Sequence, residues 1–227
     1  MAAHLNIWIN AAQALAQQLP GIERYDDSNV TIEPDLSGLA PPDSVSLDFQ
    51  DGVLTASGSA PHAWIASARK QALHIPGITQ YDGDGLQDLD LAELLLLKSQ
   101  LEQTVILFGV DAAQQDNRQN GLGQLPAQMK RLLQIVRTVD KRVRIVIIGH
   151  SDSSGRPQRN MELSRRRAEY VRYYLITNGI GVEYLTAQGV GADEPVRDEG
   201  LEQNKRMNRS VTFKIHLTDL PAASNGT

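Results

Sequence analysis

The sequence predicts an α+β fold (an α/β sandwich) in which helices pack on one face of a mixed sheet. Three observations support this prediction. The run VRIVIIG over 143–149 is short and rich in β-branched residues, which indicates a central strand, and its nearly continuous Val and Ile predict burial on both faces. Stretches with helical periodicity lie before and after this run. Apolar and polar residues alternate over 210–217, which is typical of a strand with one packed face and one wet face.

Composition narrows the classes of function. The chain has 227 residues and a net charge of −5, which argues against nucleic-acid binding, because nucleic-acid-binding domains are usually basic. It contains no cysteine, which excludes disulfide bonds and thiolate metal sites. No apolar run reaches the roughly 18 residues of a membrane span, and Met1 does not open a signal peptide. We therefore expect either a cytosolic protein or a soluble piece of a longer chain.

The first third of the chain contains an internal repeat. Residues 8–26 (WINAAQALAQQLPGIERYD) and 64–82 (WIASARKQALHIPGITQYD) are identical at nine of nineteen positions, at an offset of 56 residues. Each copy predicts a helix, a Pro-Gly stop and a short strand. Only the second copy is preceded by a hairpin signal, so we expect the natural protein to continue upstream of residue 1. The alternative is a complete protein whose helix–strand opening is coincidental.

The second copy predicts strand, strand, helix and strand over 44–82. Its hairpin signal is Asp51-Gly52, flanked by alternating residues that place Val45, Leu47 and Phe49 on one face. The segment DGVLTASGSAP, the helix and the PGI before the last strand resemble the BON module of bacterial envelope proteins. The resemblance assigns a partial BON-like unit to 1–43 and a second unit to 44–88. It implies that membrane phospholipid or envelope proteins bind through these repeats.

The rest of the chain predicts a linker and a second domain. The acidic stretch DGLQDLD (84–90) only partly fits a calcium loop, so we expect a solvated linker there, followed by a linker helix over 89–103. The domain over 104–218 is expected in the order β-α-β-α-β-β, with its second helix running from about 162 to 178 and ending at Asn178-Gly179. Residues 219–227 are expected to be a disordered tail.

One arginine of the second helix stands apart from its neighbours. At about 100° per residue, Arg167 falls inside the apolar stripe of this helix, while Arg165, Arg166 and Arg172 fall outside it. A buried guanidinium needs a partner. Asp152, just after the central strand, is the expected partner.

The pair has two interpretations. It is either a structural salt bridge between a loop and a helix, or part of a binding site. A site is favoured by the small residues around Asp152 and by its place at the carboxyl end of a strand, where open α/β sheets bind ligands. An acid beside an arginine suits a zwitterion, because Arg can hold a carboxylate with two hydrogen bonds while Asp accepts from an ammonium group.

Four segments of this domain together resemble the OmpA-like C-terminal domain: GHSDSSG, NMELSRRRAEYVRYYL, GVEYLTAQGVGADEPV and NKRMNRSVTF. The resemblance covers about 104–217. It implies noncovalent binding of peptidoglycan through the diaminopimelate of the stem peptide. The residues that match the family's ligand-binding positions are Asp152, Arg167, Asn160, Ser154 and Asp111. Gly109 stands where the family commonly has an acid, and Ser210 where a second arginine is usual.

The same reading argues against catalysis. The five histidines show no metal-ligand spacing, and no nucleophile elbow or phosphate-binding glycine loop is present. His150, Ser151 and Asp152 are consecutive and alternate in direction in an extended segment, so they cannot form a triad.

We expect no cofactor, no metal and no nucleic acid, and leave the oligomeric state open. We expect a periplasmic protein held at a membrane by an anchor outside this chain. The alternative is an envelope scaffold whose repeats bind protein or lipid and whose Asp152–Arg167 pair is only structural.

Overall fold

The computed structural model describes residues 14–15, 18, 33–114 and 122–220. The chain divides into two compact units, residues 1–89 and 90–227, and each is described by itself. The first copy of the repeat lies almost entirely outside the described residues, as does most of the tail predicted over 219–227.

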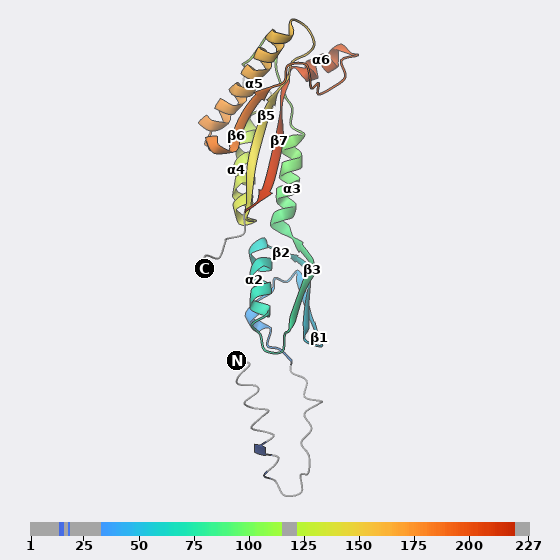
Figure 1. The fold of residues 1–227 in the computed structure, drawn as a ribbon, viewed down its shortest axis with the longest axis vertical. Helices are drawn as coiled ribbons and strands as arrows, with labels where there is room; N and C mark the ends of the chain where they lie inside the picture. The colour runs from blue at the N-terminus through green and yellow to red at the C-terminus, as the bar shows by residue number, and fades with distance from the viewer. Residues whose placement is uncertain (1–13, 16–17, 19–32, 115–121, 221–227) are drawn as a thin grey trace. The chain divides into compact units, whose positions relative to one another are not determined.

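In its described residues from 33 on, the first unit consists of a three-stranded sheet, a short 3-10 helix and a longer helix. After the short helix η1 (Ser37–Leu39) come β1 (Val45–Gln50), β2 (Val53–Ala60), α2 (His62–Ala72) and β3 (Gln80–Asp88). The order in the sheet is β1-β2-β3, with β1 antiparallel and β3 parallel to β2 (Figure 1). This is the predicted order of elements; the BON-like assignment itself stays a prediction.

The hairpin signal of this unit is confirmed. Asp51 and Gly52 both have positive φ angles, 50° and 83°, as a two-residue hairpin turn requires. The predicted solvated linker over 84–90 is wrong. Those residues continue β3 to Asp88, pairing with β2 after a register shift between Thr55 and Ser57, and a helix begins at Leu89. Acidic side chains are compatible with this strand because only its backbone has to pair, while half of its side chains face solvent.

The second unit is a four-stranded mixed sheet covered by helices. Its elements are α3 (Leu89–Glu102), β4 (Ile106–Leu107), η2 (Leu122–Gln124), α4 (Leu125–Thr138), β5 (Lys141–Gly149), α5 (Pro157–Thr177), η3 (Val182–Tyr184), β6 (Leu185–Gly189), α6 (Glu202–Asn208) and β7 (Ser210–Asp219). The order is β4-β7-β5-β6, in which β5 and β6 are parallel and β7 is antiparallel to both neighbours (Figure 1). The predicted α+β class with a mixed sheet is confirmed.

The expectation that the central strand is buried on both faces is wrong. Along β5, Val143, Ile145 and Ile147 are buried in the core, but the alternate residues are half-buried or exposed. In the described part of this unit, the buried core therefore lies on one face of β5, and its other face is partly exposed to solvent. In β5, the run of β-branched residues therefore reflects strand propensity and does not indicate burial on both faces.

Helix α3, predicted as a linker helix, is also part of the core of the second unit. Leu94 and Leu101 are fully buried in the same core as α4 and α5. The Glu102 carboxylate accepts a hydrogen bond of 2.8 Å from the backbone N–H of Ile215 on β7. Since β4 pairs with β7 only at Ser210 and Val211, α3 satisfies part of the β7 edge that the short β4 leaves unpaired.

Two glycines let α5 lie close to the sheet. A Cβ on Gly149 would overlap the carbonyl oxygen of Ser164, and one on Gly189 would overlap the backbone of Arg165. Helix α5 also begins at Pro157, five residues before the expected start, because a proline in the first turn has its φ angle preset for a helix. Together these features bring the first turns of α5 to the carboxyl ends of β5 and β6. Among the described helices, none is long and apolar enough to cross a bilayer.

Candidate functional site

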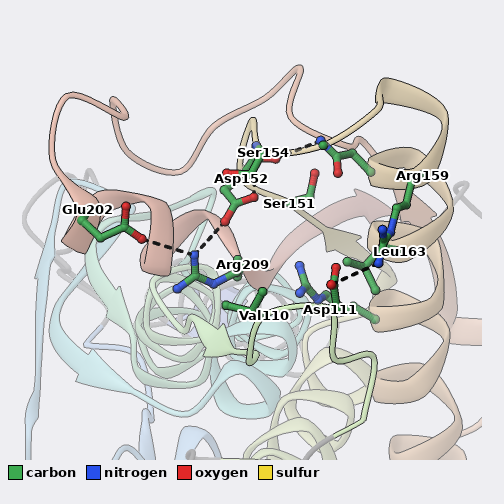
Figure 2. A pocket seen from close by; sticks show the side chains of 12 residues that line it. Val110, Asp111, Ser151, Asp152, Ser154, Arg159, Leu163, Glu202 and Arg209 are labelled. Atoms are coloured by element: carbon green, nitrogen blue, oxygen red, sulfur yellow. Dashed lines mark hydrogen bonds and ion pairs between the residues drawn. The ribbon is translucent and has the colours of Figure 1, made fainter.

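A cavity of about 290 Å³ lies at the carboxyl end of β5 (Figure 2). All five residues that the sequence indicated for a site line it: Asp111, Asp152, Ser154, Asn160 and Arg167. They come from the segment after β4, the loop after β5 and helix α5. The structure therefore brings the predicted residues together, while their role in binding stays a prediction.

Arg167 is fully buried, on the inner face of α5 as the helix arithmetic predicts. Its guanidinium donates to three backbone carbonyls: Nε to Ala112 at 2.9 Å, Nη1 to His150 at 2.9 Å and Nη2 to Gly109 at 3.0 Å. It also lies 5.4 Å from the ring centroid of Phe108. Burial lowers the pKa of Arg167 to about 10, against the opposing influence of the Asp152 carboxylate. The group therefore remains a cation at neutral pH.

The expected direct pairing of Asp152 with Arg167 is wrong. Asp152 Oδ2 instead accepts from Nη1 of Arg209 at 2.7 Å, and both side chains are largely buried. The physical reason is that each of the three guanidinium nitrogens of Arg167 already donates to a backbone carbonyl. The Asp152 side chain meets the arginine that precedes β7, which is 57 positions away in the sequence.

Local hydrogen bonds hold the loop that carries Asp152. The Ser154 N–H donates to Asp152 Oδ1 at 3.2 Å, and Asn160 Nδ2 donates to the Asp152 carbonyl at 3.0 Å. The N–H and the hydroxyl of Ser153 both donate to Glu199. Asn160 lies in the first turn of α5, rather than ahead of the helix as predicted. These contacts fix the carboxylate of Asp152 at the cavity wall.

The cavity carries three acids and three arginines with alternating charge. Arg159 pairs with Asp111 at 3.0 Å, and Arg209 lies between Asp152 and Glu202, at 2.7 Å and 3.9 Å (Figure 2). Among the described residues, Arg167 is the one cavity arginine whose hydrogen bonds go to neutral carbonyls instead of a carboxylate. Its charge is therefore the least compensated of the three and can attract an anionic group.

Sequence reasoning missed Arg159 and Arg209 as cavity residues. Arg209 lies immediately before β7, in the segment NRSVTF. This segment is part of the family resemblance, so the resemblance could have indicated Arg209 as a site residue. Ser210, where a second arginine is usual in the family, is fully buried and begins β7. Gly109, which replaces a common acid, contributes its carbonyl to Arg167.

His150 is held by the structure in one neutral form. Its Nδ1–H donates to the Glu194 carbonyl at 2.8 Å, so its Nε2 accepts from the Thr212 hydroxyl at 2.8 Å. Burial lowers its pKa below the ordinary value. Both ring nitrogens of His150 therefore have protein partners, and the residue has a structural role beside the cavity. Across the described ranges, no cluster of three or more His, Asp or Glu residues could hold a metal ion.

Comparisons with known proteins point to one family. Residues 115–209 match the OmpA family. The chain is 38% identical to outer membrane protein A of Yersinia pseudotuberculosis over 93 residues, which cover 40% of this chain and 24% of that protein. It is 37% identical to the peptidoglycan-associated lipoprotein of Pseudomonas aeruginosa over 71 residues, 31% of this chain and 42% of that protein.

A solved structure, the peptidoglycan-associated lipoprotein from Burkholderia pseudomallei, is 27% identical, with a TM-score of 0.43 over 50% of this chain and 91% of that one. The chain spans less than half the length of each of the two curated relatives just described. The match to the family falls on the unit that contains the cavity. The second unit of this chain therefore carries an OmpA-like domain over residues 115–209.

Proposed function

We propose that the second unit binds peptidoglycan noncovalently, through the diaminopimelate of the stem peptide, and so anchors an envelope protein to the cell wall. The observation that carries the proposal is the cavity at the end of β5, which both Asp152 and Arg167 line. The free end of diaminopimelate is a zwitterion with an ammonium and a carboxylate on one carbon. A cavity with both charges suits it.

The hydrogen bonds already present leave capacity for such a ligand. A guanidinium has five N–H donors, and Arg167 uses three of them, so one N–H remains on Nη1 and one on Nη2. Guanidinium N–H groups form strong, charge-assisted hydrogen bonds with carboxylates. From the described residues, Asp152 Oδ1 accepts one hydrogen bond, from the Ser154 N–H at 3.2 Å, so it can also accept from an ammonium group. Binding then needs no covalent step, which fits a non-enzymatic role.

The relatives support this assignment by their names. The Pseudomonas relative is a peptidoglycan-associated lipoprotein, and the family match spans Asp152, Arg167, Asn160 and Ser154. Asp111 lies just before the matched range, and its partner Arg159 lies inside it. We extend peptidoglycan binding to this chain and place the protein in the periplasm, where the cell wall is accessible.

The test is isothermal titration of the full chain with a muropeptide that contains diaminopimelate. We expect binding by the wild type, and a loss of at least about tenfold in Asp152→Asn, because a neutral amide cannot pair with an ammonium group. Asp193→Asn, at an exposed aspartate outside the cavity, is the matched control and should bind like the wild type. Absence of wild-type binding at millimolar ligand would sink the proposal.

One observation favours the structural alternative, in which the pair only holds the fold together. Arg167 is satisfied by three carbonyls and Asp152 by Arg209, so both residues already have structural partners. In that case Asp152→Asn would lower stability and leave muropeptide affinity unchanged. The first unit would then carry the function, as a scaffold for envelope proteins or phospholipid. Flotation of the full chain with anionic liposomes tests the lipid version, and recovery in the soluble fraction would count against it.

A further inference from the structure

The second sheet carries a group of basic side chains on the face that points away from its core. Val143, Ile145 and Ile147 of β5 are buried in the core, so the alternate residues of this strand lie on the opposite face. Strand β5 lies between β6 and β7 (Figure 1), and the pairing register puts residues of both neighbours on that face as well. Four exposed basic residues form what we call the basic sheet face: Arg142, Arg144, Lys214 and His216.

The basic groups of this face are neighbours across the strands. Arg144 lies directly opposite His216, and Lys214 occupies the diagonal position next to Arg144. Opposite charges in such positions stabilise a sheet, whereas like charges destabilise it. The fold therefore gains nothing from this arrangement, and residues that conflict with simple packing rules tend to serve a function.

Two carboxylates at the border of the face are paired with other lysines. Glu102, which lies near His216, accepts from Lys98 at 2.6 Å and from the backbone N–H of Ile215 at 2.8 Å. Asp219 accepts from Lys141 at 2.6 Å. Within the described residues, the charges of Arg142, Arg144 and Lys214 are therefore not neutralised by an ion pair.

The rest of the face is polar. Its exposed uncharged residues are Thr186 and Gln188 of β6 and Thr218 of β7. Among the described residues of these three strands, no large hydrophobic side chain is exposed. Stable protein interfaces and bilayer-binding surfaces usually contain exposed aromatic or aliphatic anchors, which this face does not offer. Cations interspersed with hydroxyl and amide groups suit a hydrated, polar polyanion instead.

We infer that the basic sheet face is a second contact surface for the cell wall, which attracts the polymer by charge while the cavity binds one diaminopimelate; the inference rests on the proposed peptidoglycan function. Peptidoglycan is a hydrated polymer whose stem peptides carry more carboxylate than ammonium groups, so its charge is complementary to this face. Both surfaces belong to one unit, because β5 contributes to the face and its carboxyl end leads into the cavity. A polymer that occupies both surfaces binds with avidity.

The two surfaces can be separated by the size of the ligand and by salt. A soluble muropeptide occupies only the cavity, whereas purified sacculi can contact both surfaces. Exposed charges each contribute little and are screened by salt, so the contribution of the face should be largest at low ionic strength.

The decisive variant is the double substitution Arg144→Gln/Lys214→Gln in the full chain. At about 0.05 M salt we expect its affinity for sacculi, measured by co-sedimentation, to be about 3–10-fold below that of the wild type. Its affinity for the soluble muropeptide, measured by titration, should be unchanged. The difference on sacculi should vanish at about 0.5 M salt. The urea midpoint should stay the same or rise, because the substitutions remove two neighbouring cations.

The matched control is Lys130→Gln/Arg137→Gln. Both residues are exposed on α4, which packs against the core side of the sheet, and the variant loses the same two charges. It should bind sacculi like the wild type. An equal loss in both double variants would reveal an effect of net charge and refute the contact surface.

The remaining outcomes distinguish the face from the cavity. If Arg144→Gln/Lys214→Gln binds sacculi like the wild type, the contact surface is refuted and the proposed function stands. A parallel loss of muropeptide affinity in this variant would also refute it, and so would a loss seen only with anionic phosphatidylglycerol vesicles, which would assign the face to a bilayer. If the wild type binds sacculi through the face but does not bind the muropeptide, the face stands and the diaminopimelate site fails. If it binds neither, both fail.

Discussion

The two units have the same kind of architecture, a sheet packed against helices, but they differ in what they bury. In the described part of the chain, eight polar or charged residues are buried: His150, Ser151, Asp152, Asn160, Ser164, Arg167, Asn208 and Ser210. All eight belong to the second unit, between the end of β5 and the start of β7. The small core of the first unit, formed by Leu39, Leu54, Ala72 and Ile78, is apolar.

This difference indicates where each unit is specialised. Burying polar groups costs free energy unless every group finds a partner, so a fold gains nothing from gathering eight of them at one end of a sheet. Conflicts with simple packing rules tend to lie at functional sites. The second unit has such a place, at the mouth of its cavity. Among the described residues of the first unit, the buried core has no comparable cluster of polar groups.

The two units can be followed separately during unfolding. Both tryptophans, Trp8 and Trp64, fall within residues 1–89. The Trp64 indole N–H donates to the Leu39 carbonyl at 2.9 Å, so its fluorescence reports on the packing of α2 in the first unit. Circular dichroism reports on both units. A Trp8→Phe background leaves a single reporter.

The largest effect is expected for Arg167→Met. The substitution leaves the carbonyls of Gly109, Ala112 and His150 without their donor, and we expect the second unit to lose about 3–5 kcal/mol of unfolding free energy. The measurement is the urea midpoint of the circular dichroism transition. Arg166→Met, at the exposed neighbouring position, should stay within about 0.5 kcal/mol of wild type. A fluorescence transition that shifts together with the circular dichroism would show that the two units do not unfold independently.

A smaller effect is expected for Gly149→Ala, which tests the close approach of α5 to the sheet. The added Cβ overlaps the Ser164 carbonyl, so the helix must move, at a cost of about 1–3 kcal/mol to the second unit. Gly58→Ala is the counterpart in the first unit. Gly58 has a φ angle of 115° and its Cβ would overlap the Ser44 carbonyl. We expect the first variant to shift only circular dichroism and the second to shift fluorescence. Gly123→Ala, with open space around the added methyl group, is the control.

The smallest effect is a pH dependence from His150. Burial lowers the pKa of His150 in the folded protein, so the unfolded chain binds a proton near its ordinary value of about 6.5 while the folded chain does not. The second unit should therefore lose stability as the pH falls below about 6.5 toward the lower folded pKa. Urea midpoints at pH 7.5 and 5.5 measure this loss. We expect His150→Asn to flatten the difference, and an unchanged slope would assign it to another group.

Much of the local structure could be predicted from the sequence. The Asp51-Gly52 hairpin, the end of α5 at Asn178-Gly179 and the alternation along β7 all follow from a few neighbouring residues. Helix periodicity also singled out Arg167 as buried. Helix α6 and the continuation of β3 through acidic residues were missed, because their local signals are weak and pairing or packing with distant segments decides them.

The candidate site divides in the same way. From the sequence, five residues of the cavity at the end of β5 could be named, by helix geometry and by the resemblance to the family motif, but Arg159 and Arg209 were missed. Only the tertiary structure decided how they pair: Asp152 with Arg209 across 57 positions, and Arg167 with carbonyls 55 and 58 positions away. The reason is physical. A charged side chain is satisfied by whichever group the packed chain brings within about 3 Å, and that choice is made when loops and strands distant in sequence meet.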